Sequence, residues 1–470
     1  MLLASGLSLA TVAAVCRPAV LRWRQLVTTL IVIILFIPMR RYSLPGTLPF
    51  QLEPYRLFVL LVVLGWLASL LVDRRLHFRR TGFEAPLALI VGAVIGSDIA
   101  NPGRVAGVSS EVAKSLTFFV SFVLVLYMIS SVVHRLEDVD YLVKALVFCG
   151  GVVGVFAVIE ARTGFNVFNH LSRILPFLRY GQIAGPAFVR LGTAKLRVFG
   201  SAEHPIALSA ALVMLIPLAI YLWRRYRQRR WCLCALALAA ASASTVSRTG
   251  VVMLLVTGIV FILLRPRQAR RYWPALFPAL IVIHFAVPGT LGALKQSFLP
   301  TGGLVAQQKG DAKGSGSGRI ADLGPGLRLW EATPLLGQGY GTQIVNPNKG
   351  GIDANIFDDQ WLGTLLATGA LGFFGWAWFF TRIVRRLAAE AKRDDSDRGS
   401  LLTAIAASVA AYAFGMTTFD AFAFVQVTFL LFILTALGSA LLAERPTPLA
   451  ERIRRNAATN PRVAPVGDMA

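Results

Sequence analysis

Hydrophobic residues fall in long blocks along most of the chain, and short polar stretches separate the blocks. Apolar runs of nearly bilayer-crossing length predict membrane-spanning helices. We place these helices at about 26–39, 55–72, 84–99, 113–133, 142–160, 206–223, 231–246, 250–264, 274–290, 359–381, 401–416 and 422–443. A shorter run, Leu2 to Val15, is a signal-like segment, an interfacial helix or a thirteenth span. The pattern therefore predicts an all-α, polytopic transmembrane helix bundle of twelve spans, or of thirteen if the first run also spans.

Two long connections interrupt the apolar blocks. They run from about 161 to 205 and from about 291 to 358, and both are rich in glycine, proline and polar residues. The second contains a flexible low-complexity stretch, 310–318. The chain then divides into an N-terminal apolar and basic segment (1–25), transmembrane helices with the first outer loop (26–290), a long extracytoplasmic loop domain (291–358), C-terminal transmembrane helices (359–443) and a basic cytoplasmic tail (444–470).

Composition and charge agree with this division. The chain is 56% hydrophobic and 15% charged, with 47 Lys and Arg against 24 Asp and Glu, a net charge of +23. The basic clusters at 74–80, 224–230, 265–271 and 382–393 occupy alternate, mostly short connections, which indicates that these face the cytoplasm. We therefore expect no nucleic-acid partner. Arg40 and Arg41 break the rule, because the alternation places them outside.

The sequence predicts neither a metal site nor a cofactor. Its four cysteines lie in or beside apolar runs and lack metal-site spacing with histidines, so we expect no disulfide and no structural zinc. No P-loop, HExxH motif or nucleophile elbow is present.

One arginine stands at the corner of a predicted membrane hairpin, in the sequence from Thr245 to Gly250. A charge at membrane depth costs a few kcal/mol and usually faces the protein interior or a water-filled cavity. Arg248 is therefore a candidate functional residue. The alternative is an arginine that reaches the headgroups and only anchors the hairpin.

Further candidates lie in the two outer loops. Arg197 and His204 precede a helix that begins at Pro205, and Glu203 or Ser201 nearby suits a helix cap. Helix N-termini bind phosphates, and guanidinium groups clamp them bidentately. The second loop and the point where the chain re-enters the membrane supply Arg319, Arg328 and the adjacent acids Asp358 and Asp359.

The predicted topology brings Arg197, His204, Arg248, Arg319 and Asp358 to one face at one depth. A basic cluster with an acid beside it suits transfer from a lipid-linked pyrophosphate, which needs cations for the leaving diphosphate and a base for the acceptor hydroxyl. The acids also suit a plainer role, because carboxylates at a helix start complement the helix dipole.

Four local patterns give the chain a resemblance to the superfamily of O-antigen ligases and polymerases, which are bacterial membrane glycosyltransferases. They are 199–205, the corner 247–250, Arg319 followed by 334–339, and the re-entry stretch 360–362 with 369–372. The resemblance spans roughly 113–381, and the order and spacing around one long outer loop carry it.

The resemblance implies a metal-independent, inverting transfer of a glycan from undecaprenyl pyrophosphate to a saccharide, lipid or protein acceptor. The reaction would take place at the outer side of the bacterial cytoplasmic membrane. Arg248 and Arg319 match the two arginines that hold the pyrophosphate, with Arg197 and Arg328 as further candidates. Asp358 stands where many relatives have a histidine, so we assign it as the base, with His204 as the second candidate.

Two other functions fit some of these residues. A flippase or transporter of lipid-linked saccharide would also hold a pyrophosphate with arginines, but it needs polar residues along its helices toward the cytoplasm. The polar groups here gather at the predicted outer ends instead. A purely structural scaffold would leave Arg248 and the segment 334–341 without a role. Ligase and polymerase are not separated by these residues.

Overall fold

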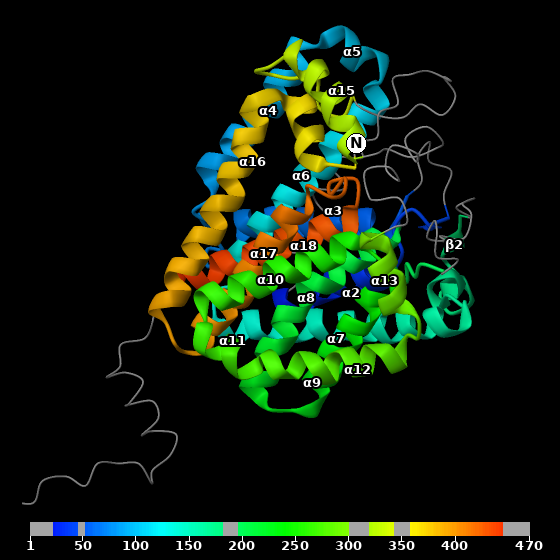
Figure 1. Cartoon of the computed structure of the whole chain (residues 1–470). Coiled ribbons are helices and arrows are strands. Elements are labelled where there is room, and N and C mark those ends of the chain that lie inside the picture. Colours follow the sequence, from blue (N-terminus) through cyan, green and yellow to red (C-terminus); the bar gives the residue numbers. More distant parts are fainter. Residues whose placement is uncertain (1–21, 46–51, 182–195, 300–318, 343–357, 445–470) are drawn as a thin grey trace, which may run out of the picture.

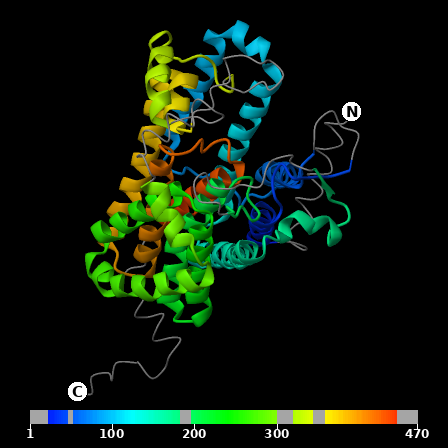
Figure 2. The same ribbon diagram turned by 45° about the vertical axis from the view of Figure 1, so that its right-hand side comes forward.

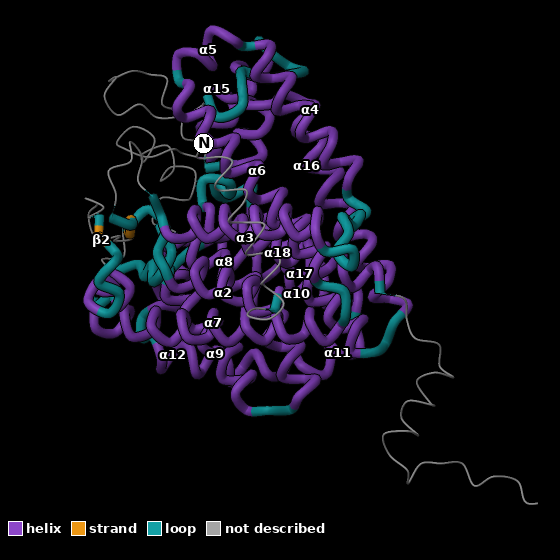
Figure 3. Tube along the Cα trace, turned by 180° about the vertical axis from the view of Figure 1, so that it is seen from behind, coloured by secondary structure: helices purple, strands orange, loops and turns teal. Residues whose placement is uncertain are grey.

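The computed structural model describes residues 22–45, 52–181, 196–299, 319–342 and 358–444, with only the backbone given at 272 and 319–322. The run Leu2 to Val15, the stretch 310–318 and the tail after Glu444 lie outside the described residues. Figure 3 shows that helices make up most of the described chain.

The helices follow one another with two short 3₁₀ turns among them. They are α2 (Trp23–Phe36), α3 (Pro54–Val72), α4 (Glu84–Ala100), α5 (Pro102–Gly107), α6 (Ser109–Val132), α7 (Leu136–Thr163), η1 (Val167–Arg173), α8 (Pro205–Tyr226), α9 (Arg229–Ser244), α10 (Arg248–Leu264), α11 (Pro266–Tyr272), η2 (Trp273–Ala275), α12 (Leu276–Ala286), α13 (Thr290–Phe298), α15 (Arg319–Glu331), α16 (Gln360–Arg393), α17 (Asp397–Gly415) and α18 (Val425–Ala443). Two strands, β1 (Tyr42–Ser43) and β2 (Arg179–Tyr180), pair antiparallel.

The centre of the bundle is formed by α8 and α18. The most apolar stretch of 18 residues is 83% buried inside the protein in α8 and 94% buried in α18. Such burial suits helices that are apolar around their whole circumference. Figure 1 shows α8, α17 and α18 in the middle of the molecule, with α9 and α12 along its lower edge. The interior of the bundle therefore consists of protein on all sides of α18.

Six of the described helices are long and apolar enough to cross a membrane: α3, α6, α7, α8, α16 and α18. The chain is thus a multi-pass membrane protein, and the all-α prediction is confirmed. The predicted span 274–290 is a bent pair instead, because α12 and α13 meet at 106° around Val287–Gly289. Counted together, the pair makes a seventh span. The total of twelve or thirteen stays a prediction.

The longest helix, α16, joins two ends of the molecule. It runs from near α15 to the side where α11 lies, and Figures 1 and 2 show α4 and α6 rising beside its upper half. The helix bends at Gly369, whose φ of 64° and ψ of −165° are not helical. It packs against α4 and against α17.

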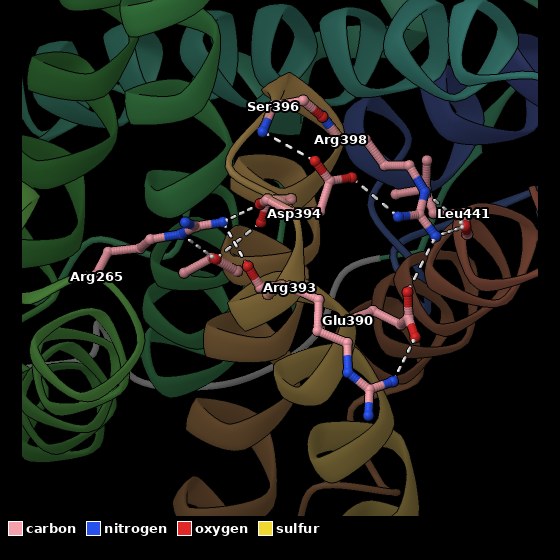
Figure 4. A network of polar contacts seen from close by, with 10 residues as sticks. Arg265, Glu390, Arg393, Asp394, Ser396, Arg398 and Leu441 are labelled. Atoms are coloured by element: carbon pink, nitrogen blue, oxygen red, sulfur yellow. Dashed lines mark hydrogen bonds and ion pairs between the residues drawn. The ribbon is translucent and has the colours of Figure 1, made fainter. Parts of the chain in front are cut away.

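Two buried arginines tie four helices together at the far end of α16 (Figure 4). Arg265, at the end of α10, donates to the backbone carbonyls of Ala391 and Asp394 and pairs with Asp395. Arg398, on α17, pairs with Asp394 at 3.0 Å and donates to the Leu441 carbonyl of α18 at 2.9 Å. A buried charge needs such partners. The network, which we call the arginine clamp, therefore fixes the ends of α10, α16, α17 and α18.

The predicted topology can be checked by cysteine labelling. We expect a Gly324→Cys variant to react with a membrane-impermeant maleimide in intact cells and a Lys392→Cys variant to react only after permeabilisation, because basic connections stay in the cytoplasm. Both positions are exposed, in α15 and at the end of α16. The native cysteines are replaced by serine as the background. Labelling at 392 with protection at 324 would reverse the topology.

Candidate functional site

A cavity of about 770 Å³ lies where six parts of the chain meet. Its walls come from the connection between α2 and α3, from α6, from the start of α8, from the segment before Thr342, from the start of α16 and from the connection between α17 and α18. Its polar and charged side chains are Arg40, Glu111, Lys114, Ser115, His204, Tyr340, Asp358, Gln360 and Asp420. The cavity thus joins cations, carboxylates and a histidine that are far apart in the sequence.

His204 is the N-cap of α8. Its Nδ1 accepts a hydrogen bond from the backbone N–H of Ile206 at 3.2 Å, and Pro205 occupies the first turn, as predicted. The ring stacks on Phe424 with centroids 5.7 Å apart. Because Nδ1 accepts, the neutral ring carries its proton on Nε2. In this tautomer Nε2 can donate a hydrogen bond, and the role of His204 as the second candidate base stays a prediction.

The two adjacent acids at the start of α16 have different roles. Asp359 is the N-cap, and its Oδ1 accepts from the backbone N–H groups of Trp361 and Leu362 at 2.9 and 3.2 Å. Asp358 lines the cavity. The plain capping role considered for both acids is observed for Asp359, and the role of Asp358 as the base stays a prediction.

Gln360 fixes the start of α16 against the connection between α17 and α18. Its backbone N–H donates to the Met416 carbonyl at 2.8 Å, and its Oε1 accepts from the Phe422 N–H at 2.7 Å. Trp361 adds a bond from its indole N–H to the Ala413 carbonyl at 2.9 Å. These contacts set the position of Asp358 relative to that connection.

Asp420, on the same connection, is a cavity residue that the sequence reasoning missed. Burial raises its pKa to about 6, the nearby charge of Asp358 adds to this, and the Ala423 N–H and Arg40 act in the opposite direction. A carboxylate with this pKa is a stronger base than an ordinary aspartate. The sequence did contain a signal for Asp420, because a single acid between two apolar runs is costly at the membrane and indicates a function.

Arg40 and Lys114 form the cationic part of the wall, and the sequence reasoning missed both. The neighbouring Arg41 is buried and donates to the Gly200 carbonyl at 2.9 Å and to the Ala202 carbonyl. The segment that leads into α8 is thereby fixed to the connection between α2 and α3. The sequence signal for Arg40 and Arg41 was their position in a connection predicted to lie outside, where basic residues are otherwise scarce in short loops.

The corner between α9 and α10 lies beside the cavity. Arg248 is the first residue of α10 and is half-buried, and Arg197 donates from Nε to the Thr245 carbonyl at 3.1 Å. Thr249 shares a hydrogen bond of 3.0 Å with Thr418, two residues before Asp420. Neither Arg197 nor Arg248 is among the residues that line the cavity. Arg197 and Arg248 thus both belong to the corner, Arg197 through its bond to Thr245 and Arg248 as the first residue of α10. The predicted pairing of Arg248 with Arg319 stays a prediction.

The other two predicted arginines belong to α15. Arg319 begins the helix, and its side chain lies outside the described residues. Arg328 is exposed and is not among the cavity residues. Their part in a site stays a prediction.

The segment from Pro334 to Gly341 is docked into the bend of α16. The N–H groups of Gln338 and Gly339 donate to the Leu366 and Ala367 carbonyls at 2.8 and 3.2 Å, and the Ala370 N–H donates to the Pro334 carbonyl at 2.9 Å. The bend at Gly369 leaves these carbonyls without helical partners, and the segment satisfies them. The segment also carries Tyr340 into the cavity wall.

Gly337 is one of two glycines at which this contact is especially close. Its φ is 71°, and a Cβ there would lie 2.6 Å from backbone atoms of Ala367 and Gly369. We expect Gly337→Ala to destabilise the protein by about 2 kcal/mol or more, because a left-handed conformation and a backbone clash add. Thermal unfolding in detergent measures the change. Gly324→Ala is the matched control, since a Cβ at Gly324 meets nothing within 4 Å. Equal melting temperatures of the two variants would contradict the docking.

Within the described residues, no group of three or more His, Cys, Asp or Glu side chains could hold a metal ion. The cavity offers three carboxylates, two cations and several hydrogen-bond donors, which can bind an anion and accept a proton.

Residues 233–377 match the family model of the O-antigen ligases. The matched stretch contains α9, the corner at Arg248, α15, the docked segment and the bend of α16. The match supports the resemblance to the O-antigen ligase and polymerase superfamily; the segment that leads into α8, with His204, lies outside it. No curated protein matches the chain.

Proposed function

We propose that this membrane protein, which matches the O-antigen ligase family, moves a glycan from a polyprenyl pyrophosphate to an acceptor hydroxyl in the cavity described above. The family match points to glycosyltransferase activity in polysaccharide synthesis. The observation that carries the proposal is the joining of Asp358, His204, Arg40 and Lys114 in one cavity. Such a site can neutralise a leaving diphosphate and deprotonate a hydroxyl.

The reaction is a single displacement at the anomeric carbon. The acceptor oxygen forms the new bond as the bond from the anomeric carbon to the diphosphate oxygen breaks, and the configuration inverts. Asp358 takes the hydroxyl proton, and the bonding electrons leave with the diphosphate. Arg248 and Arg319 bind that diphosphate, with Arg197 and Arg328 in support and His204 donating from Nε2. No metal is needed in this scheme.

We place this reaction at the extracytoplasmic face of the bacterial cytoplasmic membrane. Long loops lie there under the predicted topology, and the cavity walls come from connections predicted on that face and from the adjoining helix ends. A flippase would need a polar path to the opposite face. The lower parts of α8 and α18 are buried in apolar contacts instead.

A transfer assay tests the function. Lipid-linked glycan is extracted from cells that lack the protein and is mixed with purified protein in liposomes together with an acceptor fraction from the same cells. We expect one polyprenyl diphosphate for each glycan transferred, with no loss of rate in EDTA. Movement of the glycan lipid between leaflets without cleavage would favour the flippase and contradict the proposal.

A further inference from the structure

Arg40 is held in an unusual position at the wall of the cavity. It stands on the connection between α2 and α3 with a left-handed φ of 61°, a conformation that is uncommon outside glycine. Its side chain remains 44% exposed although it lies at the cavity. A cation placed only to stabilise the fold would be expected to be enclosed by its partners, as Arg41 is.

Three contacts fix Arg40. Its backbone N–H donates to Glu53 Oε2 at 2.6 Å, its Nη1 lies 3.2 Å from Glu203 Oε2, and its Nη2 donates to the Ala423 carbonyl at 3.2 Å. These partners come from three separate connections. The guanidinium is therefore oriented before any ligand arrives, which reduces the entropy that binding would cost.

Glu203 is a poorly satisfied counter-ion. Its side chain is only 7% exposed, and its Oε1 is buried without a hydrogen-bond partner among the described residues. Burial raises the pKa of Glu203 to about 7, although Arg40 acts in the opposite direction. Glu203 is therefore a counter-ion that holds Arg40 in place but that a more strongly charged anion can replace.

We propose that Arg40 is a further residue that binds the diphosphate of the lipid-linked donor, and that Glu203 is the counter-ion which the diphosphate replaces. The inference rests on the proposed function. A diphosphate carries more charge than one carboxylate and offers oxygens in the spacing that a guanidinium binds with two hydrogen bonds. Lys114, on the same cavity wall, supplies a second positive charge. Glu203 thus keeps Arg40 in place without a ligand.

The test is the affinity of purified protein for undecaprenyl diphosphate in nanodiscs of uncharged lipid. We expect Arg40→Gln to weaken binding about tenfold to a hundredfold, because a charge-assisted hydrogen bond is lost. Arg40→Lys should weaken it as well, since an ammonium cannot form the two-pronged contact. Arg173→Gln, an exposed arginine at the end of η1, is the matched control and should bind as the wild type does.

Glu203→Gln separates binding from a structural role. The amide oxygen can still accept from Arg40 while the competing negative charge is gone, so we expect roughly threefold to tenfold tighter binding. A structural role predicts weaker binding instead, together with a lower melting temperature. That result, or unchanged binding by Arg40→Gln, would overturn the inference. Failure of the wild type in the transfer assay would instead overturn the proposed function, and the binding titration does not depend on that assay.

Discussion

Replacing Asp358 with asparagine is expected to lower kcat by about a hundredfold to ten-thousandfold, the range that a positioned general base contributes. The affinity for the lipid-linked donor should stay close to that of the wild type, because the arginines bind the diphosphate. Asp358 lines the cavity, whereas its neighbour Asp359 caps α16 by accepting hydrogen bonds from backbone N–H groups. Steady-state transfer measured over a range of donor concentrations separates the two quantities.

Glu137→Gln is the control for this variant, because it removes an exposed carboxylate at the start of α7, away from the cavity. It should leave kcat unchanged. Lost donor binding with preserved turnover in Asp358→Asn would mean that Asp358 only orients a cation. A large loss in Asp420→Asn with little effect of Asp358→Asn would assign the base to Asp420.

The pH profile distinguishes these two carboxylates. Burial raises the pKa of Asp420 to about 6, so a reaction that needs it as base loses rate as the pH falls through about 6, where the protonated form predominates. Asp358→Asn would move that loss to lower pH, because it removes a like charge. Three other charged or titratable groups interact with Asp420: Arg40, Tyr340 and Tyr412.

Arg248→Ala is expected to reduce kcat/KM by about a hundredfold to a thousandfold. Enzymes lose rate by a similar factor when one hydrogen-bond donor to the negative charge of the transition state is removed. Arg248→Lys should fail nearly as badly, because an ammonium cannot reproduce the planar two-pronged contact. The position supports a role in binding rather than in folding. A cation at the first residue of α10 is unfavourable toward the helix dipole, so the dipole gives no structural reason for an arginine there.

The measurement is glycan transfer by variants that show the wild-type melting temperature. Arg173→Gln serves again as the control for loss of one outer arginine. Normal transfer by a stably folded Arg248→Ala variant would remove Arg248 from the site. If Arg248→Ala loses transfer activity but Arg248→Lys keeps it, Arg248 supplies only a positive charge.

Local signals in the sequence predicted local structure well. Pro205 and His204 mark the start of α8, and an acid marks the start of α16, because caps and first-turn prolines act within a few residues. The bend in α16 was not predicted. It depends on Gly337 and Gly369 packing together across the chain, and no periodicity reports such a contact.

Two missed cavity residues had readable signals. Arg40 breaks the charge distribution of the loops, and Asp420 is a single acid between two apolar runs. Each was a costly charge at the membrane boundary, which is the criterion that selected Arg248. Lys114 gave no comparable signal, since only the fold places it at the cavity wall.

The arginine clamp ties α10, α16, α17 and α18 together at the end opposite the cavity. Asp358 and Asp420 lie at the other end of these helices, at the start of α16 and on the connection between α17 and α18. Arg40 donates to the Ala423 carbonyl on that same connection, and α6, which carries Lys114, packs against α18. The carboxylates and the cations therefore belong to one connected framework, so we expect the site to keep its arrangement whether or not a substrate is bound.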